Sequence, residues 1–360
     1  MTQEALFGEL RSILQQPASQ ETWDALCDHL DLWSPDALER VALPYALDLV
    51  RRWPGELRRR APDRWVARLL EGGDVATLAL ATTLFAGGQA RSPSTLAAMA
   101  ASPRLADLVS LSLGGGSIDD AGLAALAASP HLSALTQLNL PHNTFGDAGA
   151  AALAASPLLT CVADLNLSGC RALGAAGITA LAASPRLSNL ALLHLSLCRV
   201  GDAGLAALAA SPHLTRLIHL DLSSGGIGDA GVAALAASQG LTRLGSLNLS
   251  YNQLSDACIT ALAASPLLAH VTHLDLTSCG IGDAGVRALA NAPHLTRLIH
   301  LTLDNNRVGY AGISALANAH QLATLRYLGL HRCGIRKPSQ RALAASPYLH
   351  ESIRTHRYTG

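Results

Sequence analysis

The stretch LSALTQLNLPHNTFGDAGAAALAASP, residues 132–157, decides the fold. Its leucines at 138 and 140 alternate with polar residues, which places both leucines on one face of a short, half-buried strand. The aspartate of Asp147-Ala148-Gly149 is the expected helix N-cap, and the Ala-rich run after it favours a helix close to the sheet. Ser156-Pro157 ends that helix because proline cannot continue it. One unit is therefore strand, turn, helix and return.

The same pattern recurs along most of the chain. Its Leu-x-Leu pairs begin at nine positions: 111, 138, 165, 193, 220, 247, 274, 301 and 328. Successive pairs are 27 residues apart except for one step of 28, where an extra residue lies between Cys170 and Gly177. The segment STLAAMAASPRL at 94–105 matches the helical half of a unit, so we expect a degenerate half unit at the start. Such a period indicates a solenoid of stacked thin layers.

A repeat in which every position of the pattern is present reads L-x2-L-x2-L-x-L-x2-N-x-F. This pattern resembles the leucine-rich-repeat family, specifically its ribonuclease-inhibitor-like class. The resemblance implies an α/β horseshoe with a parallel concave sheet and convex helices. It also implies that an Asn or Cys five residues after the first strand leucine bonds backbone groups inside the coil. Seven units match in this column, which we expect to form a buried structural ladder: Asn143, Cys170, Cys198, Asn252, Cys279, Asn306 and Cys333.

The chain ends depart from the repeat. Residues 1–92 lack the period and are predicted to form a helical cap or docking region, with helices at about 3–15, 20–32, 35–52, 61–72 and 74–86. Their start is similar to a short helical domain found ahead of bacterial leucine-rich repeats. The solenoid is expected over 93–346, followed by a C-terminal cap or tail over 347–360, since a solenoid needs covered end layers.

Some units lack part of the helix-start pattern. The aspartate is replaced by Ala175, Tyr310 and Lys337, and the following glycine becomes Cys258 in the sixth unit. If each aspartate caps its own helix, the helices that begin at these positions are the weaker ones.

Composition excludes several classes of function. The 360 residues carry zero net charge with a pI near 7.2, so no global field attracts nucleic acid or an anionic membrane. The absence of a signal peptide or of a long uncharged apolar stretch predicts a cytoplasmic protein without a membrane span. The seven cysteines form no CxxC pair, which argues against a disulfide framework or a zinc ribbon. We expect no cofactor, no metal and no catalytic residue.

The side chains that point away from the core on each strand differ most between units. Framework leucines are shared by all units and cannot distinguish partners, whereas Tyr and Arg often dominate binding energy. We therefore expect a protein-interaction scaffold, not an enzyme, that binds a protein partner on the concave face. The expected contact residues are His194, His219, Asp221, Tyr251, His273, Asp275, His300, Tyr327 and Arg332. The identity of the partner, the pathway and the oligomeric state do not follow from the sequence.

Two alternative functions remain. His194 and Asp221 are expected on adjacent strands, as are His273 and His300, which is compatible with a metal-dependent hydrolase. Repeat duplication explains the same His-x-Asp pairs, and we favour that explanation. The arginine-rich segment 51–68, with its tryptophans, suggests a nucleic-acid or acidic-peptide patch, or a second partner at the N-terminal helices. We favour a solvated helix face balanced by the preceding acidic residues, which makes nucleic acid the weaker expectation.

Overall fold

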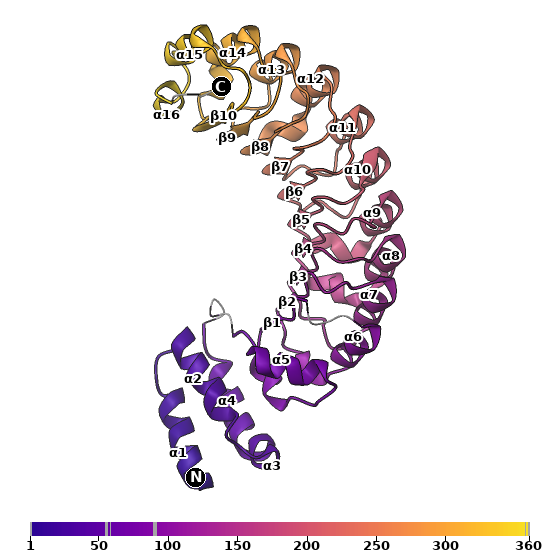
Figure 1. Ribbon diagram of the computed structural model, residues 1–360, viewed down its shortest axis with the longest axis vertical. Coiled ribbons are helices and arrows are strands. Elements are labelled where there is room, and N and C mark those ends of the chain that lie inside the picture. Colours follow the sequence, from indigo (N-terminus) through magenta and orange to yellow (C-terminus); the bar gives the residue numbers. More distant parts are fainter. Residues whose placement is uncertain (1, 55–56, 58, 89–91, 357, 359–360) are drawn as a thin grey trace.

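The computed structural model, which describes residues 2–54, 57, 59–88, 92–356 and 358, is a curved solenoid (Figure 1). A parallel sheet runs along the inner side of the curve, and helices line its outer side. The N-terminal helices lie at one end of the arc, and the C-terminus lies at the other. The predicted α/β solenoid with a concave sheet and convex helices is thus confirmed.

Within the described residues, the sheet contains ten parallel strands that follow one another in chain order. Their bounds are β1 (Thr83–Phe85), β2 (Ser110–Ser112), β3 (Gln137–Asn139), β4 (Asp164–Asn166), β5 (Leu192–His194), β6 (His219–Asp221), β7 (Ser246–Asn248), β8 (His273–Asp275), β9 (His300–Thr302) and β10 (Tyr327–Gly329). Equivalent leucines pair across neighbouring strands, as Leu138 does with Leu165. These central leucines are buried, so the two flanking side chains of each strand lie on the open face.

The helices of the array stack against one another on the convex side (Figure 1). They are α6 (Pro93–Ala100), α7 (Asp120–Ala127), α8 (Asp147–Ala155), α9 (Ala175–Ala182), α10 (Gly201–Ala210), α11 (Asp229–Ala236), α12 (Asp256–Ala264), α13 (Asp283–Ala290), α14 (Tyr310–Ala317) and α15 (Lys337–Ala344). Short 3-10 helices occur on several returns: η3 (Pro103–Leu105), η4 (Pro157–Cys161), η5 (Pro185–Asn189), η6 (Pro266–His270) and η7 (His320–Leu322). The serine before proline also ties neighbouring repeats, because Ser156 Oγ donates to the carbonyl oxygen of Ala127 at 2.5 Å.

The aspartates cap the helix of the next repeat, which corrects the N-cap assignment made from the sequence. Asp147 Oδ1 accepts hydrogen bonds from Gly174 N at 2.7 Å and Gly177 N at 2.9 Å, at the start of α9. Its own helix, α8, has Gly146 as N-cap residue, and the carboxylate that caps α8 is Asp120 of the preceding repeat. Because the helices stack in register, the first residue of one helix lies beside the free N–H groups of the next. Aspartates with such bonds to the next repeat are Asp120, Asp147, Asp202, Asp229, Asp256 and Asp283.

The glycine of Asp-Ala-Gly belongs to the same contact. A Cβ atom on Gly177 would lie 2.8 Å from Asp147 Oδ1, so only glycine leaves room for the carboxylate. In the unit where Cys258 replaces glycine, Ser255 Oγ caps α12 instead, and the aspartate of the preceding repeat bonds to Ser255 N at 2.8 Å. The Asp and Gly of the repeat motif are therefore partners across consecutive units.

This offset changes which helices lack a cap. The expectation that α9 and α14 are the weaker helices is wrong, because Asp147 caps α9 and Asp283 Oδ1 accepts from Gly309 N at 2.7 Å at the start of α14. Ala175 and Tyr310 instead precede α10 and α15, and neither of these two helices has a side-chain cap from the described residues.

The N-terminal region is helical as expected over most of its length. Its elements are α1 (Gln3–Leu14), α2 (Gln20–Leu30), α3 (Pro35–Ala37), the π-helix η1 (Leu38–Ala42), α4 (Leu43–Val50) and α5 (Asp63–Leu70). The helix expected over 74–86 is wrong: the chain forms the 3-10 helix η2 (Ala76–Leu80) and then β1. Strand pairing overrides the local helical pattern there, because Thr83 lies opposite Ser110 at the edge of the sheet. No helix among the described residues is long and apolar enough to cross a membrane.

Both edges of the sheet are covered. At the N-terminal edge, Ala61 N donates to Thr83 O at 2.8 Å, and Trp23 Nε1 donates to Arg60 O at 2.8 Å, so that α2 holds the covering segment in place. At the C-terminal edge, Ser352 of α16 (Glu351–Arg354) donates through Oγ to Arg326 O at 2.7 Å. Covered edges prevent strand addition by another chain.

Candidate partner-binding face

The open face of the sheet carries two columns of side chains, one on each side of the buried leucines. The first column contains Ser110, Gln137, Asp164, Leu192, His219, Ser246, His273, His300 and Tyr327. The second contains Ser112, Asn139, Asn166, His194, Asp221, Asn248, Asp275, Thr302 and Gly329. Since parallel strands lie about 4.8 Å apart, each position of a column lies beside its equivalent on the next repeat.

Aromatic rings gather on the later strands of this face. The ring centroids of His300 and Tyr327 are 4.0 Å apart and nearly parallel, and His273 stacks on His300 at 5.6 Å. A second pair, His194 and His219, lies 4.8 Å apart with tilted rings. Tyr327 is 48% exposed, so the stack presents a ring surface to solvent. Offset and stacked ring pairs of this kind stabilise one another by roughly 1 kcal/mol.

The carboxylates of the second column are fixed by the turn that follows each strand. Asp221 Oδ1 accepts from Ser223 N at 3.0 Å, and Asp275 Oδ1 accepts from Thr277 N at 2.8 Å. Asn248 makes the same bond to Ser250 N at 2.9 Å. In these three units the turn uses a side-chain oxygen acceptor, and the Asn248 bond shows that the turn does not need the negative charge.

Burial lowers the pKa of two of these histidines. For His219, burial is the larger cause and the neighbouring His194 adds to it, against a smaller opposing effect of Asp221. For His300, burial again acts first, followed by His273, and Asp275 opposes both. A lowered pKa keeps these imidazoles uncharged at neutral pH. These two imidazoles then add no positive charge beside the carboxylates of the two columns.

The Asn and Cys column lies inside the coil. Asn252 is 3% exposed; its Oδ1 accepts from Ile227 N at 3.0 Å, and its Nδ2 donates to Leu222 O at 3.0 Å and to Leu249 O at 2.9 Å. Cys279 in the next unit donates through Sγ to Leu249 O at 3.2 Å. The seven ladder residues thus bond the backbone of the coil: Asn143, Cys170, Cys198, Asn252, Cys279, Asn306 and Cys333.

A family model described as "Leucine Rich repeat" matches four stretches of the chain, at residues 131–154, 187–209, 211–236 and 268–290. These stretches lie inside the ten-stranded array. The chain is a leucine-rich-repeat protein. Its assignment to the ribonuclease-inhibitor-like class stays a prediction.

Several solved structures resemble this leucine-rich-repeat chain. An internalin (InlF) from Listeria monocytogenes strain 4b F2365 is 21% identical over 76% of this chain and 86% of that one, with a TM-score of 0.39. The actin-binding site 2 of leiomodin-1 is 20% identical over 40% and 88%, with a TM-score of 0.31. TLR13 in complex with ssRNA13 is 18% identical over 70% and 36%, with a TM-score of 0.43. Similarity at this level carries no functional inference. No curated protein sequence matches the chain significantly.

Two of the expected contact residues of this leucine-rich-repeat face are placed differently from the expectation. Tyr251 and Arg332 lie in the turns after their strands and not on the sheet. Tyr251 and Arg332 have φ values of 57° and 54°, in the left-handed region, because the three-residue strands end before these positions. Tyr251 is 59% exposed, so it borders the concave face at its rim.

His194 and Asp221 lie opposite each other on adjacent strands, as expected. His194 Nε2 also lies 3.7 Å from Asp164 Oδ1 on the preceding strand. Asp164 was not among the expected contact residues, although its place in the first column could have identified it. In the part of the chain that the structure describes, no three His, Cys, Asp or Glu side chains are arranged to hold a metal ion.

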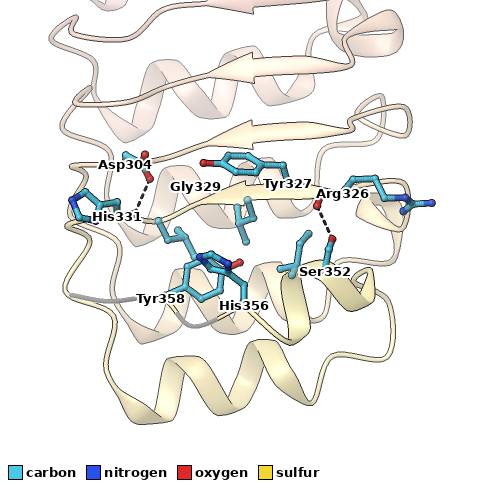
Figure 2. A pocket seen from close by; sticks show the side chains of 11 residues that line it. Asp304, Arg326, Tyr327, Gly329, His331, Ser352, His356 and Tyr358 are labelled. Atoms are coloured by element: carbon cyan, nitrogen blue, oxygen red, sulfur yellow. Dashed lines mark hydrogen bonds between the residues drawn. The ribbon is translucent and has the colours of Figure 1, made fainter.

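A pocket of about 300 Å³ lies beside Tyr327 at the C-terminal end of the face (Figure 2). Asp304 and Tyr327 lie on one side of it, Tyr358 on the other, and the backbone of Gly329 between them. Asp304 Oδ1 accepts from His331 N at 2.7 Å. Asp304 was not among the expected site residues, although it interrupts a column that carries Ser or Thr in the five preceding units.

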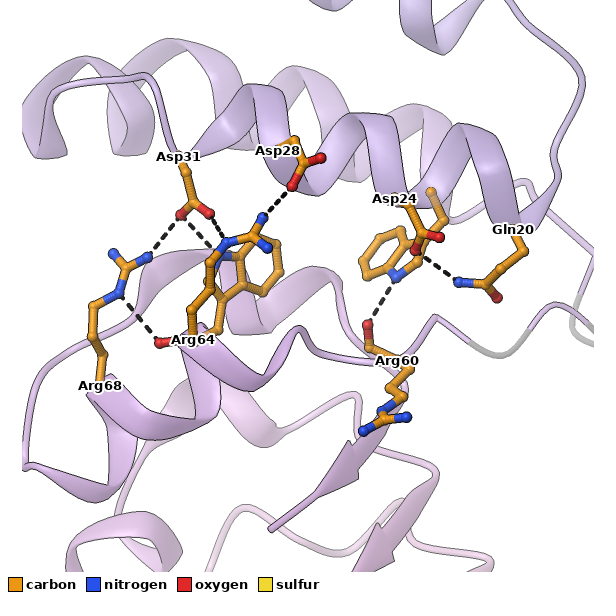
Figure 3. A network of polar contacts seen from close by, with 9 residues as sticks. Gln20, Asp24, Asp28, Asp31, Arg60, Arg64 and Arg68 are labelled. Atoms are coloured by element: carbon orange, nitrogen blue, oxygen red, sulfur yellow. Dashed lines mark hydrogen bonds and ion pairs between the residues drawn. The ribbon is translucent and has the colours of Figure 1, made fainter.

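The arginine-rich segment 51–68 is neutralised by acidic neighbours (Figure 3). Arg64 pairs with Asp28 at 2.7 Å and with Asp31, and Arg68 pairs with Asp31 at 2.8 Å. Burial opposes ionisation of Asp31, but hydrogen bonds from Arg64, Trp65 and Arg68 outweigh it and lower its pKa. Further pairs along the segment are Arg51 with Asp107, Arg52 with Asp48 and Arg60 with Asp63. Glu56 and Arg58 lie outside the described residues.

The cysteines divide into one exposed thiol and a buried set. Cys161 is exposed, whereas burial raises the pKa of Cys170 to about 11 and those of Cys198 and Cys279 to about 12, and also raises that of Cys333. A thiol with a pKa of 11 is about one thousandth thiolate at pH 8.

We expect a thiol reagent at pH 8 to modify Cys161 within minutes and to reach the four ladder cysteines only on unfolding. Mass spectrometry of the labelled chain would assign the sites. A Cys161→Ser variant, which should then take up almost no label before denaturant is added, serves as the control. Rapid native labelling of Cys198 or Cys279 would contradict the buried ladder.

Proposed function

We propose that this protein is a non-enzymatic scaffold that binds a protein partner on the concave face of its later repeats. The observation that carries the proposal is the ring surface of His273, His300 and Tyr327, which is set on a rigid sheet and flanked by Asp275. Leucine-rich repeats present such a curved surface without requiring any chemistry from it. Rigid, partly exposed rings contribute binding energy at a low cost in conformational entropy.

The alternatives receive less support. The described arginines of segment 51–68 are largely engaged by carboxylates, which leaves little free positive charge for nucleic acid. The N-terminal region covers the edge of β1, so its proposed role is that of a cap; a second partner there remains an expectation. A cytoplasmic location also remains a prediction, which fractionation of the native cell would test.

The concave site is tested by removing one exposed ring. Tyr327→Ala should weaken binding of a partner captured from native extract by more than about tenfold, or 1.4 kcal/mol. The free energy of unfolding should fall by at most about 1 kcal/mol. The Tyr327 ring is half exposed, and its removal mainly abolishes the stack on His300.

The chain offers a matched control for this variant. Tyr310 is 57% exposed, but it begins a convex helix. Tyr310→Ala should leave the affinity unchanged. If Tyr310→Ala abolished binding and Tyr327→Ala did not, the concave face would not be the partner site.

A further inference from the structure

Apart from histidines, the ionisable residues of the concave columns that are charged at neutral pH are all acidic. Their eighteen positions contain three aspartates, Asp164, Asp221 and Asp275, and no lysine or arginine. Arginines such as Arg332 occur in the turns beyond the strand ends. Because the lowered pKa values keep His219 and His300 neutral, the negative charge of the columns is not cancelled locally at neutral pH.

The two later carboxylates are oriented but not neutralised. Asp221 and Asp275 each use Oδ1 to accept a backbone N–H, at 3.0 Å and 2.8 Å. Within the described residues, neither makes an ion pair, whereas Asp164 lies 3.7 Å from His194. Each turn thus fixes a carboxylate whose second oxygen remains available on the open face.

The rings beside these carboxylates are arranged in parallel. His273 precedes Asp275 by two residues on β8, so both side chains lie on the same face of the strand. His300 lies opposite His273, and Tyr327 stacks on His300 at 4.0 Å with an angle of 21° between the rings. Stacked rings cover each other's faces, so the ring face left open on the side of β7 is that of His273, whose neighbour there is the small Ser246 and whose strand carries the fixed carboxylate of Asp275.

A guanidinium group matches both features. It is planar, stacks on aromatic faces, and donates paired hydrogen bonds to a carboxylate, whereas an ammonium group lacks the plane. On the basis of the proposed concave binding function, we infer that the partner is a protein that inserts arginine side chains against the open ring face of His273, where they pair with Asp275 and Asp221.

The experiment uses the full chain and blocked eight-residue peptides of alternating Gly with Arg, Lys or Glu as probes, with affinity measured by calorimetry at low salt and pH 7.5. The Arg peptide should bind at least fivefold more tightly than the Lys peptide, and the Glu peptide should not bind. The double variant Asp221→Asn/Asp275→Asn should weaken Arg-peptide binding at least tenfold, because the charge is lost while the acceptor oxygen remains.

The chain itself supplies the controls. Asn248 shows that asparagine supports the same turn, so the double variant should melt at the wild-type temperature. Asn248→Asp, which places a third carboxylate between the two, should tighten Arg-peptide binding severalfold. Equal affinity for Arg and Lys peptides, or unchanged binding by the double variant, would overturn the inference.

The outcomes separate this inference from the proposed function. If Tyr327→Ala weakens capture of the native partner but the double variant does not, the concave site stands and the arginine partner is rejected. If neither variant affects the native partner, both are rejected.

Discussion

Replacing Asn252 by alanine should destabilise the protein by about 2–3 kcal/mol, one of the two largest effects we expect from a single substitution. The side chain accepts from Ile227 N and donates to Leu222 O and Leu249 O, all inside the coil. Alanine would leave Ile227 N and Leu222 O without this partner, whereas Leu249 O keeps the thiol of Cys279. Each unsatisfied buried group costs roughly 1–3 kcal/mol, less whatever water recovers. Urea unfolding followed by circular dichroism would measure the loss.

Two variants isolate the cause of this loss. Asn252→Cys should cost less than alanine, because a thiol there can donate to Leu222 O of the preceding unit, as Cys279 does to Leu249 O, although it cannot accept from Ile227 N. Asn318→Ala removes an exposed asparagine that bonds Ser314 O at 2.8 Å, and should change stability by less than about 0.5 kcal/mol. If Asn252→Ala were as mild as Asn318→Ala, the ladder would not stabilise the coil.

Periodicity made the array predictable from the sequence. The spacing of the leucines is a local property repeated many times, so strand, helix and the inward direction of the leucines follow from it without knowledge of long-range contacts. The strand β1 was not predicted although it keeps the period, since Leu84 lies 27 residues before Leu111, its partner in the sheet. Ala86 stands where the other units have the second leucine, so the Leu-x-Leu pattern does not reach this strand.

The concave face was predictable in composition but not in geometry. Alternation placed His273 and His300 on adjacent strands, but it could not show that their rings stack with Tyr327. It also could not show that Asp275 Oδ1 is held by Thr277 N, because that bond depends on the conformation of the turn. Left-handed backbone after the strands moved Tyr251 and Arg332 to the rim for the same reason.

The aspartate motif illustrates the limit of local patterns. An Asp before an Ala-rich run satisfies every sequence rule for an N-cap of its own helix, yet stacking brings the N-terminus of the next helix to its carboxylate. The coupling of Asp147 to Gly177 in the following unit is invisible in a single repeat. It becomes apparent only when consecutive repeats are stacked against each other in the folded chain.

Asp147→Ala should therefore weaken α9 and not α8, with an overall cost of about 1–2 kcal/mol. The substitution removes the acceptor for Gly174 N and Gly177 N, the free donors at the start of α9. Hydrogen exchange should show faster exchange at the amides of Gly174 and Gly177, because both then lack a hydrogen-bond partner.

The isosteric variant Asp147→Asn separates the hydrogen bonds from the charge. Its amide oxygen can still accept from Gly174 N, so it should retain most of the stability and lose only the favourable interaction of a negative charge with the helix dipole, about 0.3–1 kcal/mol. Loss of protection at the first turn of α8 in the alanine variant, with Gly174 and Gly177 unchanged, would show that the aspartate caps its own helix. Because the offset bonds join one repeat to the next, their loss should also lower the cooperativity of unfolding, seen as a smaller urea m-value for Asp147→Ala than for Asp147→Asn.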